Sequence, residues 1–521
     1  MKKHRVHYLK NTLFPLMAFS AVTGAVTGAV IFLFKIASST VISLSGDIYA
    51  FFRADLRFLP LLLLGAAGLG LLAWLILHIA PDCRGGGIPS AIAALRGQVP
   101  IQRIISLPLI FVSSLLTYLC GVPLGTEGPS VQMGTLIGWL TSRTVGRRAP
   151  AWHRYTMTGG ACAGFAAATG APLTGIFFAF EEAHRRFTPM IFMVASVTTV
   201  ISSLTMELLC LIYGTSPRLF DFSIDSVMPL QYMWSALIVG IICGIVAIFF
   251  TKTYKRISDL LNKYAGRIPY AVRIVVIFVA VALIGIISSS FLGTGHHLID
   301  ELVEGHGVWY LVLIYLLVRT VLLMVANTQG VTGGLFIPSL AIGAMIGMLC
   351  GNGFAALGLF PREYCIVTVV IGMVSFLAAS SRVPITALAF ALEALSGLSN
   401  FLPIAIGVAI AFAVIETFGI HSFNDTVVDL KIEERNQGRE VLETEFELIV
   451  QKDSFVIGYE VRDILWPPNC IVVSVIKDPQ APQHTGLGEG DMLCVHYRTA
   501  FPEYTADRLE ELVGDQENFD F

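Results

Sequence analysis

The stretch Gly125-Thr126-Glu127-Gly128-Pro129-Ser130 decides how the rest of this sequence is read. It places one carboxylate in a glycine-flanked turn, with Pro at the first position of an apolar helix expected from about Pro129 to Leu140. The start of a helix attracts anions, because it presents unpaired N–H groups and the positive end of the helix dipole. Glu127 is therefore a tethered anion that can occupy such a site and leave it. The alternative is a solvated surface turn, which the flanking apolar segments disfavour.

Composition assigns most of the chain to a lipid bilayer. The 521 residues are 55% hydrophobic and 14% charged, with a mean hydropathy of +0.74, whereas soluble domains carry about 25% charged residues. The net charge of −3 gives no reason to expect nucleic acid as a partner. Nine cysteines lie far apart, without a CxxC pair, so we expect apolar fillers rather than disulfides, metal ligands or a cofactor site.

Apolar segments fill the chain as far as Phe418. A basic stretch, residues 1–10, precedes a run from about Leu13 to Phe34 that is too long for a signal peptide; we expect a retained first span with a cytoplasmic N-terminus. Several later segments are shorter than the roughly 20 residues that cross a bilayer. Short helices interrupted by Gly and Pro are typical of transporters whose broken helices meet near the midplane. A bundle of tilted helices without a transport role is the alternative.

The sequence repeats itself in two places, which predicts a duplicated unit. A Pro-Ser pair is followed by two glycines at equal offsets, and an Ala/Val-Pro-Leu/Ile-Thr segment leads to a glutamate at equal offsets. The matching pairs are Gly134 with Gly343, Gly138 with Gly347, and Glu181 with Glu393. We expect repeats over about 12–214 and 230–428. Membrane repeats of this kind are often inverted, with the substrate site between them.

Three glycine-rich helix openings stand out: Gly85–Pro89, Gly125–Pro129 and Gly333–Pro338. Glycines allow close approach of the backbone, and three convergent helix starts would form a dry anion site from partial charges alone. Such a site suits a weakly hydrated anion that must also leave. A phosphate-binding loop is disfavoured, because the sequence has no GxxxxGK[ST] motif. Each opening alone could be a helix-packing cluster.

The sequence resembles the CLC family of chloride channels and chloride/proton antiporters. The family patterns GSGIP, G[KR]EGP and GxFxP are matched in order by Gly85–Pro89, Gly125–Pro129 and Gly334–Pro338, within a likeness that covers about residues 12–430. The resemblance implies an all-α polytopic protein of the cell membrane with two inverted repeats of tilted and broken helices. It also implies a homodimer in which each subunit passes chloride or other small anions, and protons.

The resemblance also implies residue roles. Glu127 corresponds to the external gating glutamate and Glu182 to the internal proton-transfer glutamate of the antiporters; a surface ion pair of Glu182 with Arg185 or Arg186 is the alternative. We expect Glu181 to be a structural partner. The implied anion-binding positions are Gly86, Gly87, Ile88, Thr126, Glu127, Gly128, Leu335, Phe336 and Phe423.

Three positions depart from the family pattern. Gly86 stands where the family has Ser, Thr126 where it has Lys or Arg, and Phe423 is the best match to a Tyr whose hydroxyl meets the central anion. We therefore expect a weaker central site that rests on backbone dipoles. The preferred anion (chloride, nitrate or fluoride) and the tightness of proton coupling stay open.

The chain changes character after Val428. Strands are expected at Phe446–Val450 and Cys470–Val475, with a turn at Gly490-Asp491 into a further strand and a helix over Asp507–Val513. This segment, 431–521, resembles the C-terminal subdomain of RCK-type regulators of potassium transport. The resemblance implies a cytoplasmic α/β domain that dimerises and binds a small regulatory ligand.

The sequence thus favours a proton-coupled anion antiporter without enzymatic activity. A passive channel of the same family is the nearest alternative. A membrane enzyme is disfavoured, because neither HExxH nor GxSxG occurs. A sensor whose membrane part only anchors the C-terminal domain is a further alternative.

Overall fold

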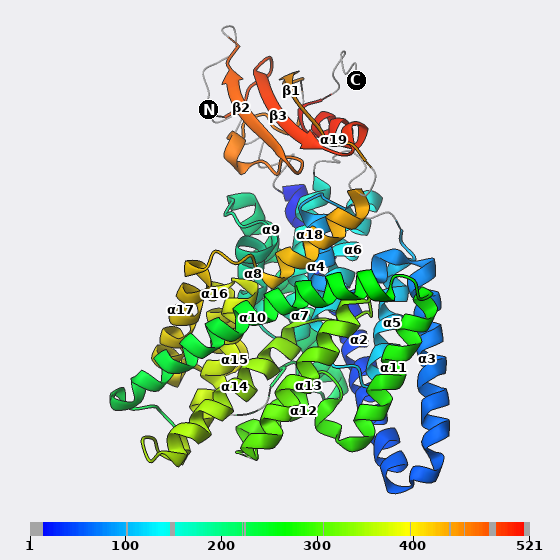
Figure 1. Ribbon diagram of the computed structural model, residues 1–521. Helices are drawn as coiled ribbons and strands as arrows, with labels where there is room; N and C mark the ends of the chain where they lie inside the picture. Colours follow the sequence, from blue (N-terminus) through cyan, green and yellow to red (C-terminus); the bar gives the residue numbers. More distant parts are fainter. Residues whose placement is uncertain are drawn as a thin grey trace.

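The computed structural model describes residues 14–99, 103–145, 152–220, 222, 226–305, 307–395, 397–436, 439–452, 454–478 and 486–514. The basic segment 1–10 lies outside these residues. Within them, nine helices are long and apolar enough to cross a membrane, and a small three-stranded sheet follows the helical bundle (Figure 1). The architecture is the expected polytopic all-α membrane fold with a small α/β domain.

The helices fall into two sets of eight within the described ranges. The first set is α2 (Phe14–Ala54), α3 (Leu59–Ile79), α4 (Gly87–Leu95), α5 (Ser106–Leu119), α6 (Glu127–Val145), α7 (His153–Thr169), α8 (Pro172–Phe178) and α9 (Pro189–Tyr213). The second set is α10 (Met233–Ala265), α11 (Tyr270–Ile287), α12 (His296–Val303), α13 (Trp309–Thr328), α14 (Phe336–Ala356), α15 (Cys365–Ser381), α16 (Pro384–Ala394) and α17 (Phe401–Thr417). Helix α18 (Phe423–Asn436) follows. The first helix continues well past the predicted end at Phe34, because no Gly or Pro stop signal follows that residue closely.

The packing confirms the duplication. Helix α6 packs along α7 and α2 along α9, as α14 packs along α15 and α10 along α17. The repeated glycines explain these contacts. A Cβ on Gly134 would collide with the backbone of Gly160 in α7, and a Cβ on Gly343 with the backbone of Gly372 in α15. Small residues at these positions bring each helix pair into direct backbone contact.

Two glutamates join the repeats by a reciprocal exchange. The Glu181 carboxylate accepts hydrogen bonds from the N–H of Thr386 at 2.6 Å and from its Oγ1 at 2.7 Å, at the start of α16. Glu393 accepts the equivalent bonds from Thr174 at 2.8 and 2.7 Å, at the start of α8. A carboxylate at a helix start satisfies otherwise unpaired N–H groups. A two-fold relation between the repeats produces such a pair of reciprocal hydrogen bonds. The expected structural role of Glu181 is therefore confirmed.

The C-terminal domain is an antiparallel sheet with one helix. Its elements are β1 (Leu442–Ile449), β2 (Cys470–Ile476), β3 (Met492–Thr499) and α19 (Pro502–Val513), with strand order β1-β3-β2. The helix begins at Pro502 rather than at the predicted Asp507, since Pro is well tolerated in a first turn. The domain covers one end of the bundle (Figure 1). There Arg154 of α7 donates to the carbonyl oxygens of Leu465 at 2.9 Å and Trp466 at 2.7 Å.

Candidate functional site

The three predicted helix openings meet at one place in the bundle. Gly125 and Gly334 form a two-bond antiparallel bridge: the Gly125 N–H donates to the Gly334 carbonyl at 2.7 Å, and the Gly334 N–H to the Gly125 carbonyl at 2.6 Å. A Cβ on Gly87 would collide with the backbone of Gly128, and a Cβ on Gly128 would lie 2.6 Å from Cα of Gly334. Only glycine permits this approach, so the expected convergence is confirmed.

The three helices begin with the same local sequence feature. Proline is the third helical residue in each, at Pro89 of α4, Pro129 of α6 and Pro338 of α14. The sequence predicts Pro129 as the first helical residue, whereas α6 begins two residues earlier, at Glu127. With either start, the first-turn N–H groups have no partner within their own helix. The N–H groups that precede each proline remain available to a ligand.

Glu127 lies at this junction and is fully buried. Its Oε1 accepts a hydrogen bond from Oγ1 of Thr126 at 2.9 Å. The backbone N–H groups of Glu127 itself and of Ile337, one from each repeat, also lie close to the carboxylate. The solvated-turn alternative is therefore wrong. The carboxylate instead occupies the space between the starts of α6 and α14, where an anion would find the same donors.

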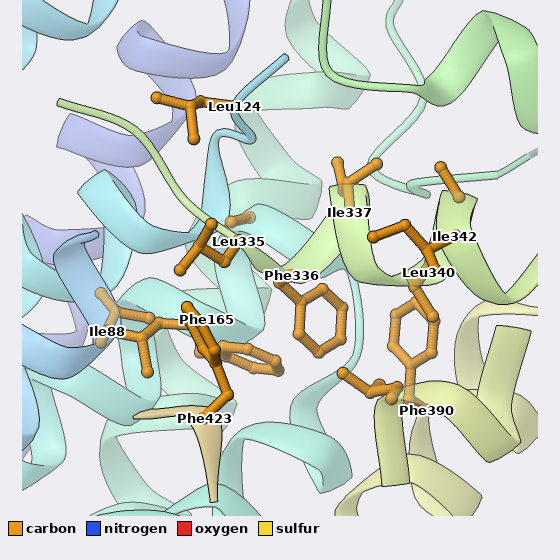
Figure 2. Packing of buried hydrophobic residues seen from close by; sticks show 14 of the residues in the cluster. Ile88, Leu124, Phe165, Leu335, Phe336, Ile337, Leu340, Ile342, Phe390 and Phe423 are labelled. Carbon is orange, nitrogen blue, oxygen red and sulfur yellow. The ribbon is translucent and has the colours of Figure 1, made fainter. Parts of the chain in front are cut away.

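Apolar side chains surround the space next to the helix starts. Ile88, Leu335, Phe336 and Phe423 belong to one continuous buried cluster, and Figure 2 shows them gathered around the start of α14. The ring of Phe336 meets Phe165 edge-on at 5.0 Å between centroids. Such a lining excludes water and strengthens the electrostatic effect of the backbone dipoles.

Phe423 begins α18 and is 3% exposed. Its ring packs edge-on against Tyr254 of α10, with 4.6 Å between centroids. The Tyr254 hydroxyl donates to Oδ1 of Asn327 at 2.8 Å. Sequence reasoning missed both of these polar residues. The available signal was an Asn at the end of an otherwise apolar helix, since polar residues inside membrane segments are commonly functional.

Glu182 lies in a widened π turn, Ala179–Ala183, that continues α8. The side chain is buried, and its Oε1 accepts a hydrogen bond from Nδ2 of Asn424, the residue after Phe423. Arg185 instead pairs with Asp425, and Arg186 donates to the carbonyl of Ile464 in the C-terminal domain. The surface ion pair considered for Glu182 is therefore wrong. Glu182 is a buried acid tied to α18, a helix that begins beside the helix openings.

This architecture defines a class: a polytopic membrane transport protein built from two inverted repeats, with a buried carboxylate where their broken helices meet. The sequence profile of the voltage-gated chloride channel family matches residues 63–416. The chain belongs to this family, whose match ends before α18 and the C-terminal domain.

Curated relatives and solved structures agree with this assignment. The chain is 30% identical over 410 residues to the H(+)/Cl(-) exchange transporter ClcA of Salmonella paratyphi B, which covers 76% of this chain and 84% of that protein. It is also 30% identical over 339 residues to ClcA of Klebsiella pneumoniae subsp. pneumoniae, covering 64% of this chain and 71% of that protein.

Among solved structures, a slow cyanobacterial Cl-/H+ antiporter superposes with a TM-score of 0.74 at 23% identity, covering 81% of this chain and 99% of that chain. A CLC-type fluoride/proton antiporter superposes with a TM-score of 0.65 at 21% identity, covering 80% and 98%. At these identities the two structures establish a shared fold.

Proposed function

We propose that this chain is a proton-coupled chloride antiporter in which Glu127 is the gate and Glu182 relays protons at the other end of the pathway. The observation that carries the proposal is the fully buried Glu127 carboxylate between two helix starts from different repeats. The relatives named as H(+)/Cl(-) exchange transporters support the choice of chloride and protons as the transported ions.

The mechanism follows from competition for backbone donors. Deprotonated Glu127 occupies the place of an anion near the amides at the starts of α6 and α14. Protonation removes its charge and weakens that interaction, so the side chain can move away and an anion can take its place. The amides of Thr126, Gly128, Leu335 and Phe336 then serve as anion donors.

The opening of α4, with Gly86, Gly87 and Ile88, lines the inner part of the anion route together with Phe423. Glu182 exchanges protons with the aqueous phase on its side of the membrane, away from this route. The anion pathway and the proton pathway thus coincide at Glu127 and diverge on the inner side of it.

The decisive experiment is coupled flux in liposomes under an imposed chloride gradient. Wild-type protein should drive protons uphill, whereas Glu127→Gln and Glu182→Gln should both abolish proton movement. Anion flux through Glu127→Gln should also lose most of its pH dependence. Glu301→Gln, at a partly exposed acid of α12, is the matched control and should pump normally. Chloride flux without proton movement in wild type would make the protein a passive channel instead.

The preferred anion is a second question for the same assay. Gly86, Thr126 and Phe423 all lack the group that the family pattern provides, so nitrate and fluoride are the rival cargoes. Proton pumping driven by gradients of each anion in turn ranks them. Stronger pumping with fluoride or nitrate than with chloride would overturn the assignment of chloride.

We also propose a homodimer in the cell (inner) membrane with both termini cytoplasmic. The domain division is 1–430 for transport and 431–521 for an RCK-C-like regulatory domain that binds a small ligand. The shared side of the termini is supported by the ring of Phe19, near the start of α2, which lies 5.6 Å from Trp152. Trp152 precedes α7, whose Arg154 contacts the C-terminal domain. Cysteine labelling from each side, and cross-linking in membranes, test these assignments.

A further inference from the structure

The space beside Gly86 contains a polar group that the gating scheme does not use. Asn327, the second-last residue of α13, is 4% exposed, and its Nδ2 has no hydrogen-bond partner in the described structure. A Cβ built on Gly86 would lie 3.3 Å from this Nδ2 and 3.4 Å from Cδ1 of Leu335. The Nδ2 atom of Asn327 therefore lies next to the place where a side chain at position 86 would stand.

The orientation of this amide is fixed by its other end. Oδ1 of Asn327 accepts the hydroxyl hydrogen of Tyr254 at 2.8 Å, which places Nδ2, with its two N–H donors, on the side of Gly86. Tyr254 is itself held by the edge-on contact with Phe423. A buried N–H donor without an acceptor is costly, so native structures rarely keep one unless a ligand or water completes it.

The repeat relation places a polar side chain at the equivalent position of the first repeat. Asn327 precedes Gly334 by seven residues, and Tyr118 precedes Gly125, the bridge partner of Gly334, by the same seven. Tyr118 is buried in the last turn of α5 and donates its hydroxyl hydrogen to the Gly125 carbonyl at 2.8 Å. The two repeats thus each place one polar side chain seven residues before the bridging glycine, and the hydroxyl of the first repeat is satisfied by a backbone carbonyl. In the second repeat this side chain has no protein acceptor.

A charged alternative nearby is already engaged. Nζ of Lys431 in α18 donates to Oγ of Ser90 at 2.6 Å and to the carbonyl of Arg84 at 2.9 Å. Two of its three N–H donors are thus bonded, and among the described side chains the nearest donor to a Cβ at position 86 is the neutral amide of Asn327. A neutral donor holds a weakly hydrated anion without trapping it as a full charge would.

We propose that Nδ2 of Asn327 is a hydrogen-bond donor to the transported anion, in place of the two hydroxyls that Gly86 and Phe423 lack, and that Tyr254 sets its orientation. The ligand class is a small monovalent anion such as chloride. This inference rests on the proposed function, because it assigns a further donor to the same anion route.

Titration calorimetry with potassium chloride on the purified full-length protein tests it. Asn327→Ala should weaken chloride binding about 10-fold, since hydrogen bonds to charged groups lie at the strong end of the range. Asn327→Asp keeps the size but replaces the donors with a negative charge, and should weaken binding by more than Asn327→Ala. Asn352→Ala, which removes an amide of α14 that contacts Gly307, is the matched control and should bind as wild type.

Rescue distinguishes a ligand from a merely structural residue. Gly86 has an ordinary extended backbone, and the vacated space in Asn327→Ala can accept a serine side chain at position 86. The double variant Asn327→Ala/Gly86→Ser should therefore recover most of the lost affinity. A structural role for Asn327 would leave the double variant as weak as the single one.

Two outcomes separate this inference from the function beneath it. If wild type binds chloride and pumps protons while Asn327→Ala binds chloride with wild-type affinity, the inference is wrong and the antiporter assignment stands. If wild type neither binds chloride nor pumps protons, both the role of Asn327 and the antiporter assignment are wrong. Should Asn327→Ala fail to fold, anomalous scattering from bromide in wild-type crystals decides: bromide within hydrogen-bond distance of Asn327 Nδ2 supports the inference, and bromide elsewhere in the route overturns it.

Discussion

A single methyl group at Gly334 should disable transport. The Cβ of Gly334→Ala would lie 2.6 Å from N of Gly128 and 3.1 Å from both Cα of Gly128 and the carbonyl oxygen of Gly125. All three obstacles are backbone atoms, so no side-chain rotation relieves them. Ordinary contact begins at 3.4 Å, so N of Gly128, at the start of α6, must move away from Gly334 by about 0.8 Å. Backbone strain from left-handed φ angles plays no part, because Gly334 has an ordinary φ.

The bridge is disturbed as well, because the carbonyl oxygen of Gly125, which accepts the 2.6 Å bond from the Gly334 N–H, must move by about 0.3 Å. A misplacement of about 1 Å at a positioned site can reduce a rate about 100-fold. We expect a loss of this order in chloride efflux from liposomes. Gly353→Ala is the control in the same region of sequence, within α14, because a Cβ there meets nothing within 4 Å.

Size-exclusion chromatography of both variants shows whether they assemble. Gly334→Ala that is monodisperse and transports chloride at the wild-type rate would refute the claim that helix openings in direct backbone contact form the site. Equal losses in Gly334→Ala and Gly353→Ala would refute it as well.

Three further predictions follow from the described contacts. Glu181→Gln and Glu393→Gln should each destabilise the bundle by about 1–3 kcal/mol, and by similar amounts because their bonds match; thermal unfolding measures both, and a large difference between them contradicts the two-fold exchange. Burial opposes ionisation of Asp491, but the Lys477 ammonium at 2.6 Å and nearby backbone N–H groups lower its pKa below the usual value. The resulting stability of the C-terminal domain is present above the unfolded pKa of about 4 and is lost as pH falls through the lower folded value; Asp491→Asn should remove this pH dependence in denaturant melts. Deletion of 439–521 should leave chloride-driven proton pumping intact, because every proposed site residue precedes this segment; loss of pumping by a monodisperse deletion variant would favour the sensor alternative.

The architecture could be predicted from the sequence, because the sequence signals for it are local. Glycines before Pro129 and Pro338 indicate helix starts. The equal spacing from Pro129 to Gly134 and from Pro338 to Gly343 indicates the repeat. Burial of Glu127 followed from apolar flanks, and the profile match to the voltage-gated chloride channel family agrees with the resemblance drawn from the motifs.

Other features could not be predicted, because they depend on contacts between distant segments. The partner of Glu182 is Asn424, far along the chain, whereas the adjacent Arg185 and Arg186 turn to other acceptors. The length of α2 was predicted wrongly for a local reason: the helix runs on to Ala54, because no Gly or Pro follows Phe34 closely. The role of Asn327 could not be predicted, because its proximity to Gly86 follows only from the packing of the two segments.

The competition between Glu127 and a passing anion is the central claim, and a crystal structure of Glu127→Gln grown in bromide tests it most directly. If Glu127 and the anion compete, Glu127→Gln shows anomalous bromide density at the place of the wild-type carboxylate, close to the N–H of Ile337, and wild type at high pH shows none there. Bromide at that place in both proteins, or in neither, would show that Glu127 and the anion do not compete for one site.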